Sequence, residues 1–145
     1  MNRNQIDGLI HKYYGIPYKH AGRDANGLDC LGLVSAFYKD CGIPLPDGDG
    51  EQYPPDWYKS DPERFWRGIT RLGREVPLNA LQPLDLVYFR MGKNITHCGV
   101  MIDPAHFLHV IEKTAVHVSP LNYSWQRRLA GARRLIQPAG EPSEN

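Results

Sequence analysis

The chain has 145 residues, a formal net charge of +1 and three cysteines. This length suits one domain with a hydrophobic core, and the near-neutral charge provides no basic field for nucleic acid or a membrane surface. No apolar run is long enough to span a membrane, and the polar N-terminal residues lack the apolar segment of a signal peptide. The cysteines are scattered and form no CxxC pair, which argues against a disulfide framework and a thiolate zinc cage.

The first half of the chain carries helical patterns. Apolar side chains recur at helical spacing over residues 4–14 and predict a first helix. Asp29 is a good N-cap for a second helix, which begins at Cys30 and ends near Gly42. Residues 60–63 match a capping box and predict the start of a third, short helix. Helices therefore come first in this chain.

The second half of the chain switches to strand patterns. Short β-rich segments bounded by turn residues predict strands at 86–89, 98–102, 107–111, 116–118 and 129–136. Helices followed by an antiparallel sheet predict an α+β domain. We expect this domain to span residues 1–139, with residues 140–145 as a frayed tail. Residues 47–72, which lie between the two halves, are interpreted as an insertion.

Cys30 is the candidate nucleophile. It lies in the first turn of the predicted second helix, where unpaired N–H groups and the helix dipole lower the pKa of a thiol. The same N–H groups can hold a developing oxyanion. The alternative is a buried structural cysteine, which is the usual state of a free cysteine. Cys41 lies at the far end of the same helix, where the dipole disfavours a thiolate, and we assign it to the core.

His97 and His109 are the candidate base and its orienting partner. A turn over residues 103–106 would pair two strands so that Gly99 lies opposite His109. His97 and His109 then become diagonal neighbours on one face, about 7 Å apart at the backbone, where imidazoles can meet. A register slip of one residue would separate them, and both can instead be ordinary polar strand residues. The remaining histidines are treated as bystanders: His11, His20, His106 and His117.

Five short motifs follow one another through nearly the whole chain. They are Gly15-Ile16-Pro17-Tyr18, Gly27-Leu28-Asp29-Cys30-Leu31-Gly32, Pro83-Leu84-Asp85-Leu86, His97-Cys98-Gly99-Val100 and Phe107-Leu108-His109-Val110. In order and spacing they resemble the motifs of the NlpC-type cell-wall cysteine peptidases, and residues 125–128 and 132–134 look like the closing segment of that family. Each motif alone is weakly specific, whereas five in order are strongly specific. The resemblance implies a papain-like fold, in which a nucleophile at a helix start packs against an antiparallel sheet.

The resemblance also implies an activity and a set of site residues. It implies a triad of Cys30, His97 and His109 that hydrolyses an amide bond in peptidoglycan stem peptides, between D-glutamate and a diamino acid or nearby, with no metal or other cofactor. It implies that the Tyr18 hydroxyl lies beside the nucleophile and binds the oxyanion or substrate; the alternative is a packed loop aromatic. Asp29 is first of all a helix cap, and it could also touch a substrate amine.

Two features match the phage-tail branch of the family most closely: Gly22-Arg23 before the loop, and the large Leu31 after the cysteine. We therefore expect a phage or prophage tail component, or a protein exported by another machine, that is synthesised in the cytoplasm without a signal peptide. Its expected partners are peptidoglycan or muropeptides and phage tail proteins. One departure from the family pattern is Leu84, which stands in place of a turn glycine and puts the local turn in doubt.

Three alternatives stay open. The first is an interbacterial toxin of the same chemistry, with an inhibitor protein as its partner. The second is a tail or envelope structural module that keeps the fold without activity, although an intact Cys-His-His set argues against it. The third is a metal site made of Cys30, His97 and His109, whose side chains suit zinc but lack an obvious fourth ligand.

Residues 47–72 are expected to form a wall or lid over the cleft, because an insertion at this place can reach the site without disturbing the sheet. Its aromatic side chains could shield an acyl-enzyme and grip the apolar groups of a stem peptide. Trp57 and Tyr58 are the expected substrate contacts, whereas Phe65 and Trp66 are expected to pack. The alternative is ordinary packing of a long connection against the domain.

Overall fold

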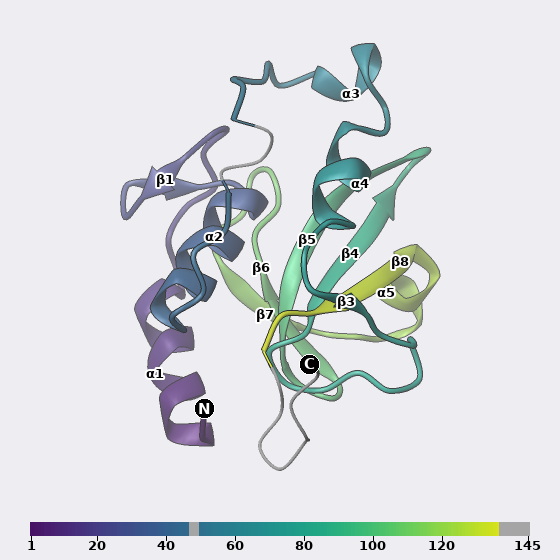
Figure 1. Ribbon diagram of the computed structural model, residues 1–145. Helices are drawn as coiled ribbons and strands as arrows, with labels where there is room; N and C mark the ends of the chain where they lie inside the picture. The colour runs from purple at the N-terminus through teal and green to yellow at the C-terminus, as the bar shows by residue number, and fades with distance from the viewer. Residues whose placement is uncertain (47–49, 137–145) are drawn as a thin grey trace.

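The computed structural model describes residues 1–46 and 50–136, which form an α+β fold (Figure 1). Among these residues the helices are α1 (Arg3–Tyr13), α2 (Cys30–Asp40), α3 (Trp57–Ser60), α4 (Arg64–Ile69) and α5 (Tyr123–Arg128). The strands are β1 (Arg23–Asp24), β2 (Gly27–Leu28), β3 (Arg74–Glu75), β4 (Leu86–Met91), β5 (Asn94–Asp103), β6 (His106–His109), β7 (His117–Pro120) and β8 (Leu129–Arg134). The predicted fold class is confirmed. The predicted tail, 140–145, lies outside the described residues. Among the residues that are described, no helix is long and apolar enough to cross a bilayer.

An antiparallel sheet organises the described part of the chain, with its strands in the order β3-β8-β4-β5-β6-β7. The ten-residue strand β5 pairs with β4 on one side and β6 on the other. The last strand in the chain, β8, lies between β3 and β4. Helices α1 and α2 lie together on one side of the sheet, whereas α5 lies next to β8 (Figure 1). Segments that are distant in the sequence therefore meet around β4 and β5.

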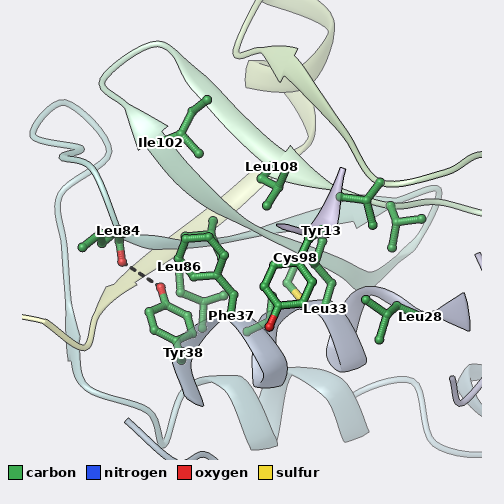
Figure 2. Close-up of a cluster of buried hydrophobic side chains, with 14 of the residues drawn as sticks. Tyr13, Leu28, Leu33, Phe37, Tyr38, Leu84, Leu86, Cys98, Ile102 and Leu108 are labelled. Carbon is green, nitrogen blue, oxygen red and sulfur yellow. Dashed lines mark hydrogen bonds between the residues drawn. The ribbon is translucent and has the colours of Figure 1, made fainter. Parts of the chain in front are cut away.

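Alternating side chains of β4 build hydrophobic clusters on opposite faces of the sheet. Leu86 and Tyr88 belong to a large cluster shared with α1 and α2, which Figure 2 shows. Val87 and Phe89 belong to a smaller cluster that Trp125 of α5 joins. Because both faces are covered, β4 has a continuous apolar sequence rather than an alternating one. Burying one side chain of this size stabilises the fold by roughly 1.5–3 kcal/mol.

Helix α2 is positioned by its cap and by its apolar face. The Asp29 Oδ1 atom accepts a hydrogen bond from the Gly32 amide at 2.8 Å, which confirms the predicted N-cap. The apolar face of α2 packs in the core, because Leu33 and Phe37 are fully buried in the large cluster (Figure 2). The cap and the packed face together fix the place where Cys30 begins the helix.

The turn before β4 holds Leu84 in a left-handed conformation, with a φ of 73°. Its amide donates to the Met101 carbonyl at 2.7 Å, and its carbonyl accepts a hydrogen bond from the Tyr38 hydroxyl at 2.7 Å (Figure 2). A side chain in this conformation costs roughly 1–2 kcal/mol, whereas burying a leucine contributes about 1.5–3 kcal/mol. The Leu84 side chain is buried. Burial of the leucine side chain therefore offsets the cost of the left-handed conformation at this turn.

A buried ion pair joins the start of β4 to β8. The Arg134 guanidinium donates to both carboxylate oxygens of Asp85, at 2.8 and 2.9 Å. Asp85 also accepts a hydrogen bond from the Gln82 amide at 2.8 Å, and Arg134 donates to the Ala80 carbonyl at 3.1 Å. Both charged side chains are buried. The aspartate of this sequence motif therefore has a structural role in the sheet.

The helices between residues 57 and 69 differ from their sequence prediction. The sequence predicts one helix that starts with a capping box over 60–63, whereas the structure contains α3 and α4. Glu63 is the N-cap residue of α4 and makes no side-chain capping hydrogen bond, so the predicted capping box is wrong. The physical reason is that residues 60–61 complete α3, where the Asp61 amide donates to the Trp57 carbonyl at 3.1 Å.

Candidate active site

Cys30 lies where the start of α2 meets β5. Its thiol is 3.8 Å from the Thr96 carbonyl oxygen, and its own carbonyl oxygen is 3.6 Å from the Cys98 thiol. The Cys30 side chain is partly buried. Helix α2 has 11 residues, and its dipole favours an anion at this end. Both the helix and the strand therefore act on the thiol.

The two predicted histidines meet in the sheet. Strands β5 and β6 pair Val100 with Leu108. This register places Gly99 opposite His109, as the sequence predicts. The His97 Nε2 and His109 Nδ1 atoms are 2.9 Å apart, and the two residues are only 3% and 0% exposed. The predicted register and the predicted shared face are confirmed.

The second ring nitrogen of His109 has a partner that the sequence does not predict. His109 Nε2 lies 2.7 Å from the hydroxyl oxygen of Ser119 in β7. The sequence predicts this strand only to residue 118 and leaves Ser119 out. The pairing of β6 with β7 brings Ser119 into the strand: His109 lies opposite His117, and the strand continues past Ser119. The polar contacts around His109 therefore cross three strands.

Aromatic side chains surround the two histidine rings. The Trp125 ring of α5 is 5.0 Å from the His109 ring and 5.8 Å from the His97 ring, measured between centroids. Phe89 lies 5.7 Å from His97, and Phe107 lies 4.2 Å from His109. A hydrogen bond shielded from water in this way is electrostatically stronger than an exposed one. The sequence marks Trp125 only as part of a closing segment, because its contact depends on how α5 packs on the sheet.

The surroundings of Cys30 favour its thiolate. A hydrogen bond from Cys98, together with the hydrogen bond and the charge of His97, lowers the pKa of Cys30 to about 5, although burial and the charge of Asp29 oppose the shift. Burial, followed by the hydrogen bond to Cys30 and its charge, raises the pKa of Cys98 well above its ordinary value. Cys98 therefore stays a thiol. Cys98 is part of the large hydrophobic cluster (Figure 2), and the sequence does not reveal its contact with Cys30.

His109 remains neutral beside the candidate base. Burial, followed by the positive charges of His97 and His117, lowers the pKa of His109 to about 2. A neutral imidazole has one N–H donor and one acceptor nitrogen. His109 can therefore orient the His97 ring through a directed hydrogen bond, without adding a second positive charge to the site.

Tyr18 lies in the loop before α2, where it forms a β-bridge with Leu28 of β2. Its amide donates to the Thr114 carbonyl at 2.9 Å, which holds the loop before α2 against the loop that follows β6. Burial, followed by the negative charges of Cys30 and Asp29, raises the pKa of Tyr18 to about 12. The phenol therefore keeps its proton and can donate it to an anion. Its role as an oxyanion or substrate ligand stays a prediction.

Both carboxylate oxygens of Asp29 already have donors. Oδ1 accepts hydrogen bonds from the Gly32 amide at 2.8 Å and the Arg23 guanidinium at 2.7 Å. Oδ2 accepts hydrogen bonds from the Ala21 amide at 3.0 Å and from the Tyr53 hydroxyl. Asp29 is only 5% exposed. A substrate amine could therefore reach this carboxylate only by displacing one of its donors, and the predicted substrate contact of Asp29 stays a prediction.

Trp57 packs beside helix α2. Its ring stacks on Phe65, with centroids 6.3 Å apart and planes 17° apart. Phe65 is buried as predicted, whereas Trp66 is 43% exposed and does not pack as expected. The lining of an apolar cavity of about 70 Å³ includes Leu31, Val34, Leu45, Trp57, Phe65 and Ile69. Because Leu31 follows Cys30 directly, the cavity lies beside the first turn of α2. The substrate contact of Trp57 stays a prediction.

The zinc alternative does not match the geometry. In residues 1–46 and 50–136, no three His, Cys, Asp or Glu side chains are grouped so that they could hold a metal ion. His97 and His109 direct nitrogen atoms at each other, whereas zinc-binding imidazoles direct theirs at a common ion. The side chains of Cys30, His97 and His109 are therefore not arranged as ligands of one common ion in this structure.

Residues 15–134 match the model of the NlpC/P60 family. The chain belongs to this family. The Murein DD-endopeptidase MepS/Murein LD-carboxypeptidase of Escherichia coli (strain K12) is 29% identical over 136 residues, which make up 92% of this chain and 63% of that protein. The gamma-D-glutamyl-L-lysine dipeptidyl-peptidase of Bacillus cereus is 30% identical over 90% of this chain and 36% of its own length. This chain thus spans less than two thirds of the length of either relative.

A solved structure agrees with the fold. The crystal structure of an NlpC/P60 family protein from Bacillus cereus superposes with a TM-score of 0.73 and 25% sequence identity, over 94% of this chain and 41% of that chain. The chain therefore has the papain-like fold of the NlpC/P60 proteins, as the motifs predict. Assignment to the phage-tail branch of the family stays a prediction.

Proposed function

We propose that this domain is a cysteine peptidase that hydrolyses an amide bond in peptidoglycan stem peptides. The observation that carries the proposal is the short contact between His97 and His109, together with the hydrogen bond and charge of His97 that help to lower the pKa of Cys30. A thiol of low pKa, a base within reach and a third group that holds the base are what attack on an amide carbonyl requires. The names of the two relatives, a murein endopeptidase and a dipeptidyl-peptidase, support the same class of reaction.

One nitrogen of His97 is left for the proposed proton transfer. Because Nε2 is bonded to His109, we assign to Nδ1 the role of taking the Cys30 proton. The thiolate attacks the amide carbonyl carbon, and the protonated His97 gives its proton to the leaving amine. Water then attacks the acyl-enzyme, with His97 again as the base, and releases the acid and the free thiol.

The proposed oxyanion ligands are the Cys30 backbone amide and the Tyr18 hydroxyl. The first amides of a helix have no acceptor within the helix, so they are available to an anion at its N-terminus. Tyr18 keeps its proton because burial and nearby negative charge raise its pKa. Removal of one such donor typically costs about 2.7–4 kcal/mol of transition-state stabilisation.

The bond between D-glutamate and a diamino acid is the proposed target within the stem peptide. The support is the motif resemblance and the name of one relative, gamma-D-glutamyl-L-lysine dipeptidyl-peptidase. The other relative is named as a DD-endopeptidase and LD-carboxypeptidase. An experiment therefore has to distinguish cleavage of this bond from cleavage of neighbouring bonds in the same peptide.

We further propose that the protein acts as a component of a phage or prophage tail. The only support is the resemblance of Gly22-Arg23 and of Leu31 to residues of the phage-tail branch. Arg23 and Leu31 also have local structural roles in this fold. Arg23 pairs with Asp29, and Leu31 lines the cavity beside α2. A toxin with an inhibitor protein is the competing assignment, with the same chemistry. Genes for tail proteins beside this gene would support the tail, whereas a gene for a small inhibitor would support the toxin.

Digestion of purified muropeptides, with products identified by mass, tests the reaction and the bond. Cys30→Ala should lower turnover by a factor of about 10⁴ or more, because the attacking group is lost. Cys41→Ser is the matched control at the other end of α2 and should keep wild-type activity. His97→Ala should be far more damaging than His109→Asn, whose amide can still bond to His97. If Cys30→Ala turns over muropeptides at the wild-type rate, the proposed mechanism is wrong. If the wild type cleaves no muropeptide, the proposed substrate is wrong.

A further inference from the structure

Ser119 is a polar side chain that the proposed mechanism does not use. His109 Nδ1 is 2.9 Å from His97 Nε2, and His109 Nε2 is 2.7 Å from Ser119 Oγ. Both ring nitrogens of His109 are therefore bonded, one toward the nucleophile and the other away from it. The serine hydroxyl contacts the nitrogen that faces away.

These contacts follow one diagonal across three neighbouring strands. Strands β6 and β7 pair His109 with His117 and Phe107 with Ser119. Ser119 is therefore the diagonal neighbour of His109, just as His109 is the diagonal neighbour of His97 across β5 and β6. Since side chains alternate between faces along a strand, the three polar groups share one face. The register that brings the histidines together also brings the serine to them.

The direction of each hydrogen bond follows from the task of His97. To take a proton from Cys30 on Nδ1, neutral His97 must carry its own proton on Nε2 and donate it to His109 Nδ1. His109 must then be the tautomer that is protonated on Nε2, and this N–H needs an acceptor. The Ser119 hydroxyl oxygen is in place to accept it. The other tautomer of His109 would direct an N–H at the N–H of His97.

We propose that Ser119 is a positioning residue, which selects the Nε2-protonated tautomer of His109 and so keeps His97 ready to accept the Cys30 proton; this role rests on the proposed peptidase function. Burial keeps the pKa of His109 at about 2, so the ring is neutral and its tautomer has to be selected. His117, whose ring centroid is 4.5 Å from that of His109, directs its Nδ1 to the Ala115 carbonyl at 2.7 Å instead.

Ser119→Ala and Ser119→Thr test the role of the hydroxyl, with Ser60→Ala as a control at an exposed position of α3. Loss of one acceptor should lower kcat about three- to tenfold, the effect of one hydrogen bond, and leave KM unchanged. Ser119→Thr should restore kcat, because threonine keeps the hydroxyl and suits a strand. Ser60→Ala should match the wild type.

Two measurements without substrate separate this role from the proposed function. Nitrogen NMR should show His109 protonated on Nε2 in the wild type and in Ser119→Thr, and a mixture of tautomers in Ser119→Ala. Alkylation of Cys30 by iodoacetamide should slow in Ser119→Ala alone. If the tautomer and alkylation results are as expected but the wild type cleaves no muropeptide, the proposed substrate is refuted and the role of Ser119 is supported. An unchanged tautomer and kcat in Ser119→Ala would overturn that role, as would a loss that Ser119→Thr does not restore.

Discussion

Two aspartate–arginine pairs with the same chemistry lie in different surroundings. Asp29 and Arg23 lie beside Cys30, the proposed nucleophile, and their side chains are 7% and 28% exposed. Asp85 and Arg134 lie in the sheet, and their side chains are 1% and 6% exposed. Each aspartate belongs to one of the sequence motifs, so the motifs alone do not tell the two roles apart.

The groups that each pair connects explain the difference. Asp29 links the loop before α2 and the first turn of α2 to Tyr53. Asp85 links the turn before β4 to Arg134 of β8. The first pair therefore sets the position of Cys30, whereas the second holds two strands together. Two ion pairs of the same chemistry therefore have different roles: one positions residues of the site, and the other stabilises the fold. The segments that each pair joins determine its role.

Asp85→Ala should have the largest effect on stability. It removes the carboxylate from a buried guanidinium, which typically costs about 3–5 kcal/mol, a large part of the 5–15 kcal/mol that stabilises a domain. Urea unfolding followed by circular dichroism measures the loss. Turnover per folded molecule should stay near the wild-type value, because this pair holds two strands together and does not position Cys30. A loss of less than about 1 kcal/mol would show that the sheet does not depend on the pair.

Asp29→Ala should destabilise the fold less and impair turnover more. Loss of an N-cap typically costs about 1–2 kcal/mol, and the partly exposed pair with Arg23 adds at most about 1 kcal/mol. Cys30 follows the cap directly, and a displacement of about 1 Å in a catalytic group can cost about a hundredfold in rate. The measurements are kcat and the urea midpoint, compared with those of Asp85→Ala. Equal turnover in the two variants would break the comparison between the pairs.

The smallest expected effect is a shift in the titration of Cys30 in Asp29→Asn. The amide oxygen of asparagine can still cap α2, but the charge is gone. Because the charge of Asp29 raises the pKa of Cys30, its removal should lower that pKa. The midpoint of Cys30 alkylation by iodoacetamide should then move to lower pH, whereas Asp85→Asn should leave it unchanged. A midpoint that moves upward would show that Asp29 acts on the thiol through the cap rather than through its charge.

Local patterns in the sequence predict the helix that Cys30 begins and the strand face that His97 and His109 share. An N-cap followed by an apolar stripe marks the helix that Cys30 begins, and the structure has that helix. Two-residue alternation around a short turn places His97 and His109 on one face, and their rings meet. Both predictions succeed because they depend only on residues near in sequence, within one helix or one hairpin.

The features that the sequence did not predict depend on packing between distant segments or on irregular turns. The contact of Cys98 with Cys30 exists only because α2 packs on β5, and no local pattern reports that packing. Ser119 lies beyond the predicted strand, and its place opposite Phe107 follows a turn in which Lys113 has a φ of 66°. A positive φ at a lysine cannot be foreseen from the residue type, since few non-glycine residues adopt it.

The activated thiol of Cys30 is assembled from segments that a ribosome makes at different times. Cys98 comes 68 residues after Cys30, so at about 5–20 residues per second Cys30 is made roughly 3–14 s before this neighbour. Until β5 docks on α2, the thiol has the ordinary pKa of about 8.5 and reacts slowly at neutral pH. A nascent or unfolded chain therefore carries an unactivated cysteine, and the rate at which Cys30 is alkylated during refolding reports the docking of the sheet on the helix.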